Sequence, residues 1–155
     1  MNAMDLTYRK TAAVGAGGFA LLIALYNTLA GDLRRAARAQ RAGDLEQRTE
    51  EVKHAIVVVA SLENWIDAES GELAQWLIGF YASLRRRMIE AQSRQSAELL
   101  ESLMTEVLDL RGIWQQLERE TKNASAEPLI LPPVATQRQG AFSSEAELQH
   151  MSWRA

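Results

Sequence analysis

Residues 70–92 have the sequence SGELAQWLIGFYASLRRRMIEAQ, and their pattern is that of one long amphipathic helix. The segment opens with serine and glycine, and Glu72 follows at a place where an acidic side chain favours the positive end of the helix dipole. Apolar residues then recur every three or four positions, which places them on one helical face. That stripe consists of Leu73, Leu77, Phe80 or Tyr81, Leu84, Met88 and Ala91. We therefore predict a helix over residues 70–92 that buries this stripe.

This predicted helix also carries apolar residues that its buried stripe does not need. Trp76, Ile78, Tyr81 and Ile89 fall outside the stripe. One apolar face is enough for a helix that packs against a single core. The excess indicates a second contact and favours a binding function.

Two helices are predicted to precede it, over residues 19–40 and 45–68. Gly43 and Asp44 separate them, as expected of a glycine that ends one helix and an aspartate that caps the next. Residues 55–60 read AIVVVA, and β-branched residues favour strands. Helix-compatible flanks and the lack of a partner strand in the sequence favour a helix instead. Because such a run points in every direction around a helix, the segment is either packed on both sides or borders a ligand groove.

A fourth helix is predicted after residue 95, with apolar residues spaced alternately three and four apart. Its seam consists of Leu100, Leu103, Val107, Leu110, Trp114 and Leu117. Four long helices joined by short links predict an all-α fold, an antiparallel four-helix bundle with a short N-terminal segment.

The character of the chain changes after Lys122, because all three prolines lie within residues 123–139. We predict a helical-bundle domain over residues 1–122 and a largely disordered, flexible tail over residues 123–155. A short last helix is predicted in that tail, capped near Ser144. It would carry Leu148, Met151 and Trp153. The tail is either a loose end or a segment that docks reversibly in a binding groove of the bundle.

Composition excludes several classes of function. The chain has 155 residues, enough for one domain with a real core, and a net charge of −3 with both signs interspersed. This balance gives no case for nucleic acid or a membrane surface as a partner. The absence of cysteine excludes disulfides and thiolate metal sites and fits a reducing compartment.

The uncharged run over residues 11–31 has some features of a secretory signal. We favour a first helix instead, because one apolar stripe continues straight through the supposed cleavage site. That stripe consists of Phe19, Leu22, Tyr26, Leu29, Leu33 and Ala37. The run is too rich in glycine for a membrane span, so none is expected.

No pattern in the sequence supports catalysis or a bound cofactor. Glu51 and His54 have the Glu-x-x-His spacing of bundle-core di-metal sites, and Glu147 and His150 repeat it. Such sites need the motif on two facing helices, whereas the second copy lies in the tail. We therefore expect a solvated Glu–His pair and no metal. Phosphate-binding loops and nucleophile motifs are absent as well, and the arginines at positions 34, 35, 38 and 41 are expected to form a solvated face.

The segment GELAQWLIGFYASLRRRMIEAQ resembles the signature helix of the flagellin export chaperones, the FliS family, whose pattern is close to GGE-x-A-x-x-L-x-x-LY-x-Y-x-x-RRL-x-EAN. Other segments are similar to the family in the same order along the chain. They are Tyr8 with residues 25–29, residues 52–62, and Leu110 and Arg111 with Trp114. The resemblance covers about residues 5–121.

This resemblance implies a cytosolic helical bundle that holds the C-terminal segment of flagellin, prevents premature polymerisation and delivers the subunit to the flagellar type III export apparatus. It also implies a client-binding groove, which we place along the second and third predicted helices. Its expected lining is Tyr26, Ile56, Val59, Leu62, Ile66, Leu77, Tyr81 and Leu84. In family members an N-terminal segment can occupy the client site, and Leu6 and Tyr8 match this plug.

The expected partners are thus flagellin and the flagellar export gate. The alternative is a helical adaptor or regulatory bundle that binds another flagellar or regulatory protein, and a homodimer of the empty chain is left open. The sequence departs from the family at residues 16–21, where AGGFAL replaces an ASPEEL-type start. Without the serine cap and the first-turn proline, we expect a frayed or late-starting first helix.

Overall fold

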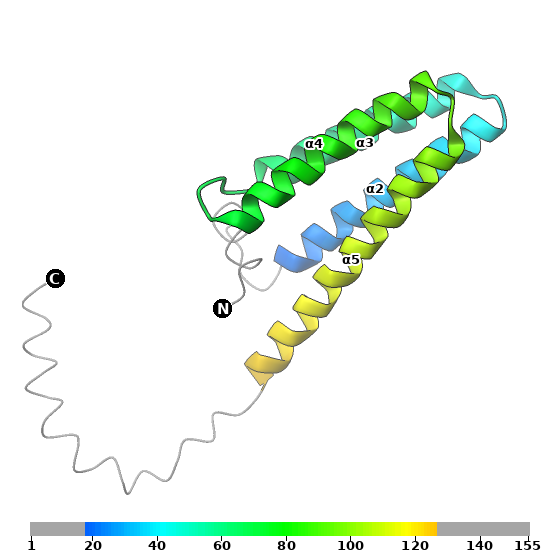
Figure 1. Ribbon diagram of the computed structural model, residues 1–155. Helices are drawn as coiled ribbons and strands as arrows, with labels where there is room; N and C mark the ends of the chain where they lie inside the picture. The colour runs from blue at the N-terminus through cyan, green and yellow to red at the C-terminus, as the bar shows by residue number, and fades with distance from the viewer. Residues whose placement is uncertain (1–17, 127–155) are drawn as a thin grey trace, which may run out of the picture. The chain divides into compact units, whose positions relative to one another are not determined.

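The computed structural model describes residues 18–126, and four α-helices account for most of them. They are α2 (Gly18–Arg41), α3 (Leu45–Asn64), α4 (Glu72–Ser93) and α5 (Ala97–Ala126). Successive helices run in opposite directions and pack as an antiparallel bundle (Figure 1), which confirms the predicted all-α fold. Across residues 18–126, no residue is in a strand, and no helix combines the length and apolarity that crossing a membrane demands.

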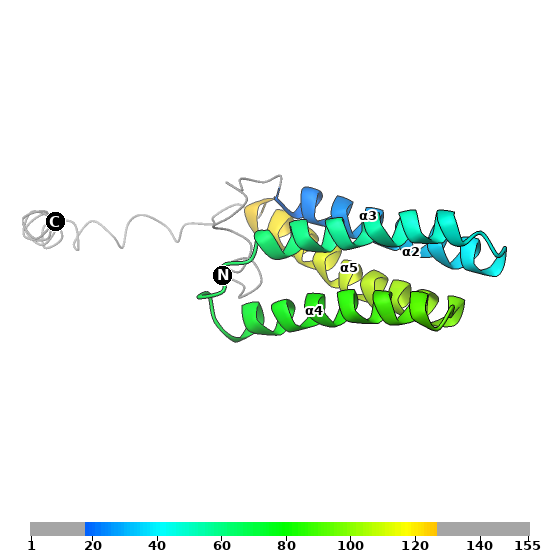
Figure 2. The same cartoon turned by 90° about the horizontal axis from the view of Figure 1, so that it is seen from above.

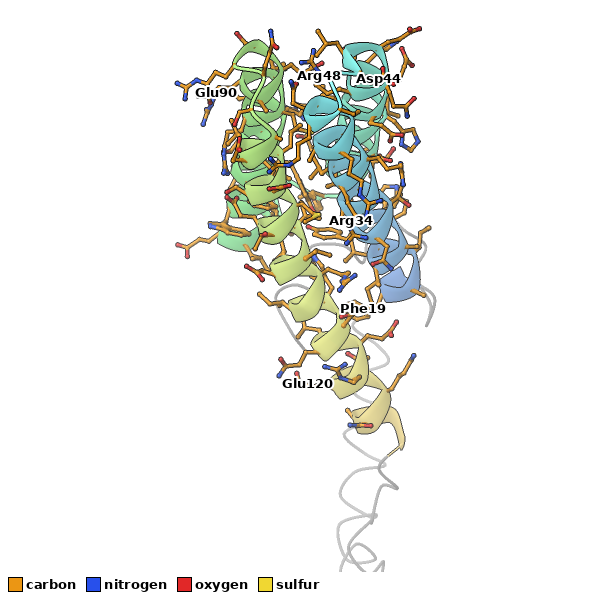
Figure 3. The ribbon with its side chains drawn as sticks, turned by 90° about the vertical axis from the view of Figure 1, so that its right-hand side faces the viewer. Phe19, Arg34, Asp44, Arg48, Glu90 and Glu120 are labelled. Carbon is orange, nitrogen blue, oxygen red and sulfur yellow. The ribbon has the colours of Figure 1, made fainter. Side chains whose placement is uncertain are left out.

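The chain divides into two compact units, Met1–Thr121 and Lys122–Ala155. The first unit contains α2, α3, α4 and most of α5, whereas the second enters the described range only as the last residues of α5. Within the first unit, Asp44 and Arg48 lie at the same end of the bundle as Glu90, and Phe19 lies near the other end (Figure 3).

The link between α2 and α3 has the form that the sequence predicts. The Asp44 N–H donates to the Ala39 carbonyl at 2.9 Å, which satisfies a backbone group at the end of α2. Gly43 has a φ of +74°, a conformation that suits glycine. Asp44 then caps α3, because its Oδ1 accepts a hydrogen bond from the Gln47 N–H at 3.0 Å.

Helix α3 ends at Asn64, earlier than the predicted end at residue 68. Asp67 explains the difference, since it closes a local turn. Its Oδ1 accepts a hydrogen bond from the Glu69 N–H at 3.1 Å, and its carbonyl accepts one from the Ser70 N–H at 3.0 Å. Aspartate side chains compete with helical hydrogen bonding in this way, and apolar periodicity does not reveal it.

Two other helix boundaries differ from the prediction by more than one residue. Helix α4 begins at Glu72 and not at residue 70, because Gly71 has a φ of +118°, which lies outside helical geometry. Helix α5 continues past Lys122 to Ala126, so the change in composition at residue 123 does not end it. Pro128 disfavours a helical conformation for the residue before it, and this limits how far α5 can extend.

The core lies between the four helices, and each contributes an apolar face. On α4 the buried residues are Ala74, Leu77, Tyr81, Leu84, Met88 and Ala91. Tyr81, and not Phe80, therefore occupies the buried stripe, and Leu73 is only half-buried. The predicted seam of α5 is buried from Leu100 to Trp114, whereas Leu117 is half-buried.

Two arginines near the middle of α4 join this helix to both of its neighbours. Arg85 forms an ion pair with Glu63 of α3, and Arg87 donates two hydrogen bonds to Glu106 of α5, at 2.6 and 2.8 Å. Helix α4 therefore contacts α3 through one flank and α5 through the other. Seen from above, α3 and α4 run alongside each other (Figure 2). These pairs fix which flank of α4 faces each neighbour.

Candidate protein-binding surfaces

The residues predicted to line a client groove lie mainly in the core. Ile56 alone is half-buried, and the other seven have side chains that are at most 9 % exposed. Those seven are Tyr26, Val59, Leu62, Ile66, Leu77, Tyr81 and Leu84. Their predicted position on an open surface is therefore wrong for this conformation. A role for them as client contacts remains a prediction, and it would require the helices to separate.

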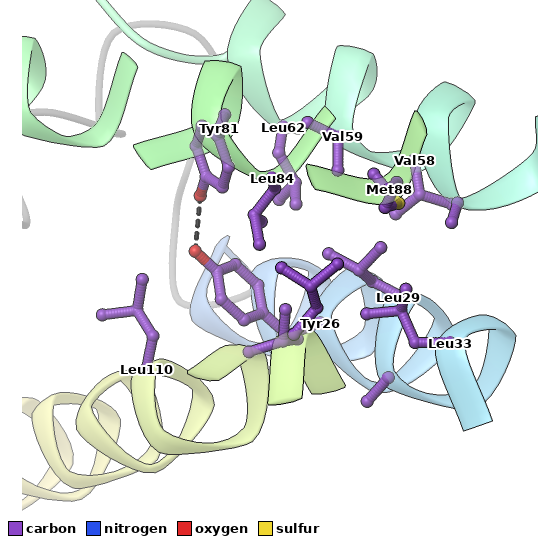
Figure 4. Close-up of a cluster of buried hydrophobic side chains, with 14 of the residues drawn as sticks. Tyr26, Leu29, Leu33, Val58, Val59, Leu62, Tyr81, Leu84, Met88 and Leu110 are labelled. Atoms are coloured by element: carbon purple, nitrogen blue, oxygen red, sulfur yellow. Dashed lines mark hydrogen bonds between the residues drawn. The ribbon is translucent and has the colours of Figure 1, made fainter. Parts of the chain in front are cut away.

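An aromatic cluster shows why these positions are closed. The hydroxyl groups of Tyr26 on α2 and Tyr81 on α4 share a hydrogen bond of 2.5 Å across the core (Figure 4). Trp114 of α5 packs edge-on against Tyr26, with ring centroids 6.2 Å apart and planes at 71°. All three side chains are 0 % exposed. Buried hydroxyl groups gain from pairing with one another, so the tyrosine pair joins α2 to α4 and stabilises the closed core. The ring contact of Trp114 adds α5 to this cluster.

The apolar excess that the sequence predicts is nevertheless present on the outside of the same helices. Val57 of α3 is 61 % exposed and Ile89 of α4 is 57 % exposed. Ile56 is half-buried beside Val57. We call these three residues the α3–α4 face.

The ion pair between Arg85 and Glu63 places this face. Ile89 lies one helical turn after Arg85, and Ile56 lies two turns before Glu63. Because α3 and α4 are antiparallel, both isoleucines lie on the same side of the ion pair, towards the link that holds Asp44. Val57 points about 100° further round α3 than Ile56, so it extends this surface outwards and does not border the ion pair. Exposed apolar side chains that lie close together are a feature of protein-binding sites.

A polar cluster between α2 and α3 differs from the expected solvated Glu51–His54 pair. Nδ1 of His54 makes a hydrogen bond of 2.6 Å with Oδ2 of Asp32, a residue that is fully buried. The Arg35 guanidinium donates to Oδ1 of Asp32 at 2.5 Å and pairs with Glu51 at 3.0 Å. Gly31 leaves room for this arginine, because a Cβ there would lie 3.1 Å from its Nη1. The expectation of a simple Glu–His pair is therefore wrong.

Electrostatics in this cluster centre on Asp32. Burial raises the pKa of the Asp32 carboxyl group above its ordinary value of 3.8, and the hydrogen bond with His54 opposes that change. In residues 18–126, no group of three or more histidine, cysteine, aspartate or glutamate side chains is arranged to hold a metal ion. The Asp32–His54 hydrogen bond and the Arg35–Glu51 ion pair join α2 to α3.

Other predicted site residues lie outside the described part of the chain. These are the plug residues Leu6 and Tyr8, and the tail residues Leu148, Met151 and Trp153. Their predicted roles remain predictions.

Most of the chain matches a model of a known protein family. The family model described as "Flagellar protein FliS" matches residues 1–121, which is more than three quarters of the chain. A comparison with curated proteins found no match.

Proposed function

This chain belongs to the FliS family of flagellar proteins, and on that premise we propose that it binds the C-terminal segment of flagellin in the cytosol. A flagellar chaperone role follows from the family itself. The client, the segment that is bound and the delivery step are the proposal. The family match over residues 1–121 is the observation that carries it.

The α3–α4 face gives this function a physical basis. The terminal segments of a polymerising subunit are apolar and amphipathic, and such segments fold when they find a partner surface. Val57 and Ile89 offer apolar surface on two adjacent helices, next to the half-buried Ile56. Full burial of such a side chain is worth about 1.5–3 kcal/mol, so a few contacts of this kind can hold a segment. Ordering the bound segment offsets part of that gain.

Binding of this kind explains how a chaperone can both protect and release its client. A flagellin segment that is folded on the α3–α4 face is not available to other flagellin subunits, which prevents premature polymerisation. Release needs competition at the flagellar type III export gate and no nucleotide hydrolysis, because apolar contacts are reversible. Leu6 and Tyr8 supply the competing segment within the chain when no client is present.

Co-purification tests this proposal. The full-length chain is expected to retain full-length flagellin and to lose flagellin that lacks its C-terminal segment. A double variant, Val57→Gln with Ile89→Gln, should weaken the complex by about tenfold or more, since about 1.4 kcal/mol corresponds to a factor of ten. Leu21→Gln is the matched control, because Leu21 is 48 % exposed on α2 and lies outside the face.

Two results would contradict the proposal. Equal retention of flagellin with and without its C-terminal segment would place the contact elsewhere on the client. No retention of either form would favour the adaptor alternative, in which the bundle binds another flagellar or regulatory protein.

A further inference from the structure

A second apolar surface lies on the other flank of α4. Trp76 is 54 % exposed on α4, and Ile113 is 46 % exposed on α5. Phe80 and Leu117 are half-buried at the edge of the core. The rings of Trp76 and Phe80 are stacked, with centroids 5.4 Å apart and planes at 4°. We call these four residues the α4–α5 face.

The ion pair between Arg87 and Glu106 shows that these residues share one side of the bundle. Phe80 lies seven residues before Arg87 on α4, and Ile113 lies seven residues after Glu106 on α5. One turn further from the ion pair, the next apolar residues are Trp76 on α4 and Leu117 on α5. Each helix thus carries a row of two apolar residues. Seven residues are close to two helical turns, so each side chain returns to the flank of the ion pair. Because α4 and α5 are antiparallel, both rows extend in the same direction.

The border of this face is acidic. Glu72 lies one turn before Trp76, Asp109 lies one turn before Ile113, and Glu120 lies one turn after Leu117. All three carboxylates are exposed, and none of them has an ion pair among residues 18–126. Glu120 accepts a hydrogen bond of 3.1 Å from the neutral Gln116 side chain, so its charge is kept. Carboxylates around an apolar strip favour a partner with complementary positive charge.

Three arginines of α4 and α5 do not neutralise this border. Arg87 is committed to Glu106. Side chains share a helix face when they lie three or four residues apart. Arg86 follows Phe80 by six residues and Arg119 follows Leu117 by two, so both exposed arginines point away from the apolar rows. The strip therefore combines an aromatic surface with net negative charge.

We infer that the α4–α5 face binds a second protein segment, an amphipathic α-helix whose apolar stripe is bordered by lysine or arginine. The apolar stripe would pack on the stacked rings of Trp76 and Phe80, as helices commonly do in apolar surfaces of partner proteins. Its basic border would pair with Glu72, Asp109 and Glu120. This partner differs from the proposed client, which occupies the opposite flank of α4.

Two synthetic helical peptides test the inference against the full-length chain. Both have about 18 residues, or five turns, and the same leucine stripe, and they differ only in lysine or glutamate at the flanking positions. Isothermal titration calorimetry is expected to show that the lysine peptide binds at least about tenfold more tightly. Raising the salt from about 0.05 to about 0.5 M should reduce that preference, because exposed charges are screened.

Variants of the chain assign the binding to the face. Trp76→Gln with Ile113→Gln should weaken binding of the lysine peptide by about tenfold or more. Asp109→Lys with Glu120→Lys should reverse the preference in favour of the glutamate peptide. Val57→Gln with Ile89→Gln is the control, since it should leave peptide binding unchanged even where it weakens flagellin. All of these positions are exposed, and circular dichroism checks that each variant is folded.

Four outcomes would overturn the inference. Equal binding of the two peptides would remove the role of charge, and full binding by the Trp76→Gln, Ile113→Gln variant would remove the face. A dimer in sedimentation that disappears with Trp76→Gln would show that a second copy of the chain covers it. Binding of the lysine peptide only to a Tyr8→Ala variant would assign the face to the N-terminal segment of the chain.

Discussion

Replacing Tyr81 by phenylalanine separates a core role of this residue from a client-binding role. The substitution keeps the ring and removes the hydroxyl group that shares the 2.5 Å hydrogen bond with Tyr26. Losing a partner for a buried hydroxyl group costs about 1–2 kcal/mol. For a unit of this size that loss lowers the melting temperature by about 4–8 °C. We therefore expect Tyr81→Phe to destabilise the chain clearly in a urea or thermal titration.

The same variant should bind the flagellin C-terminal segment with unchanged affinity, because the Tyr81 side chain is 0 % exposed. A double variant that also carries Tyr26→Phe provides the thermodynamic control. Removing both hydroxyl groups should destabilise the chain by less than the sum of the two single changes. Each single change deprives the remaining hydroxyl group of this hydrogen bond, whereas the double change leaves no hydroxyl group that needs it. Val57→Ala, on the exposed α3–α4 face, should change stability by no more than about 0.5 kcal/mol.

The reasoning fails if Tyr81→Phe leaves the melting temperature unchanged. A loss of client affinity at unchanged stability would restore the predicted groove and show that the bundle opens when it binds. Loss of both would mean that the client depends on the intact core without contacting Tyr81.

Three further predictions concern stability. Gly71→Ala should destabilise the chain by about 1–2 kcal/mol in urea titration, because φ is +118° at this residue. Gly79→Ala inside α4 should instead stabilise the chain by up to about 1 kcal/mol, since a Cβ at that position meets nothing within 4 Å. Burial raises the pKa of the Asp32 carboxyl group, so this group retains a proton more readily in the folded chain than in the unfolded chain. The stability of the wild type relative to Asp32→Asn should therefore increase as the pH falls towards 3.8. A stability difference that does not change with pH would contradict this. Arg87→Met should cost about 1 kcal/mol at low salt and less at high salt, and Glu106→Gln should match it if the bidentate pair accounts for the loss.

The sequence predicts the helices and much of the core but not which large residue of an adjacent pair faces inwards. Phe80 and Tyr81 are consecutive, so apolar spacing admits either one to the stripe of α4. The hydrogen bond to Tyr26 selects Tyr81, and no pattern within α4 contains that information. The expected groove lining includes Tyr81 and Val59, which face the core, whereas the exposed apolar residues of the same two helices are Ile89 and Val57.

The buried carboxylate of Asp32 is a second feature that sequence analysis missed. Aspartate is mostly exposed in proteins, so the residue type alone predicts a solvated position for Asp32. Asp32 lies three residues after Leu29 and four before Ala36, and this spacing is the signal that it shares a buried face of α2. The partner His54 is distant in sequence, and only the packing of α2 on α3 brings the two together.

The run of three arginines in α4 determines how this helix is oriented. Arg85 points to α3, Arg87 points to α5, and Arg86 between them is exposed. A slip of one residue would rotate every side chain by about 100° and break both ion pairs at once. Helix α4 thus has two fixed flanks of different composition, an aliphatic flank with Ile89 and an aromatic flank with Trp76. A single helix can then offer two chemically different surfaces to two different binding partners.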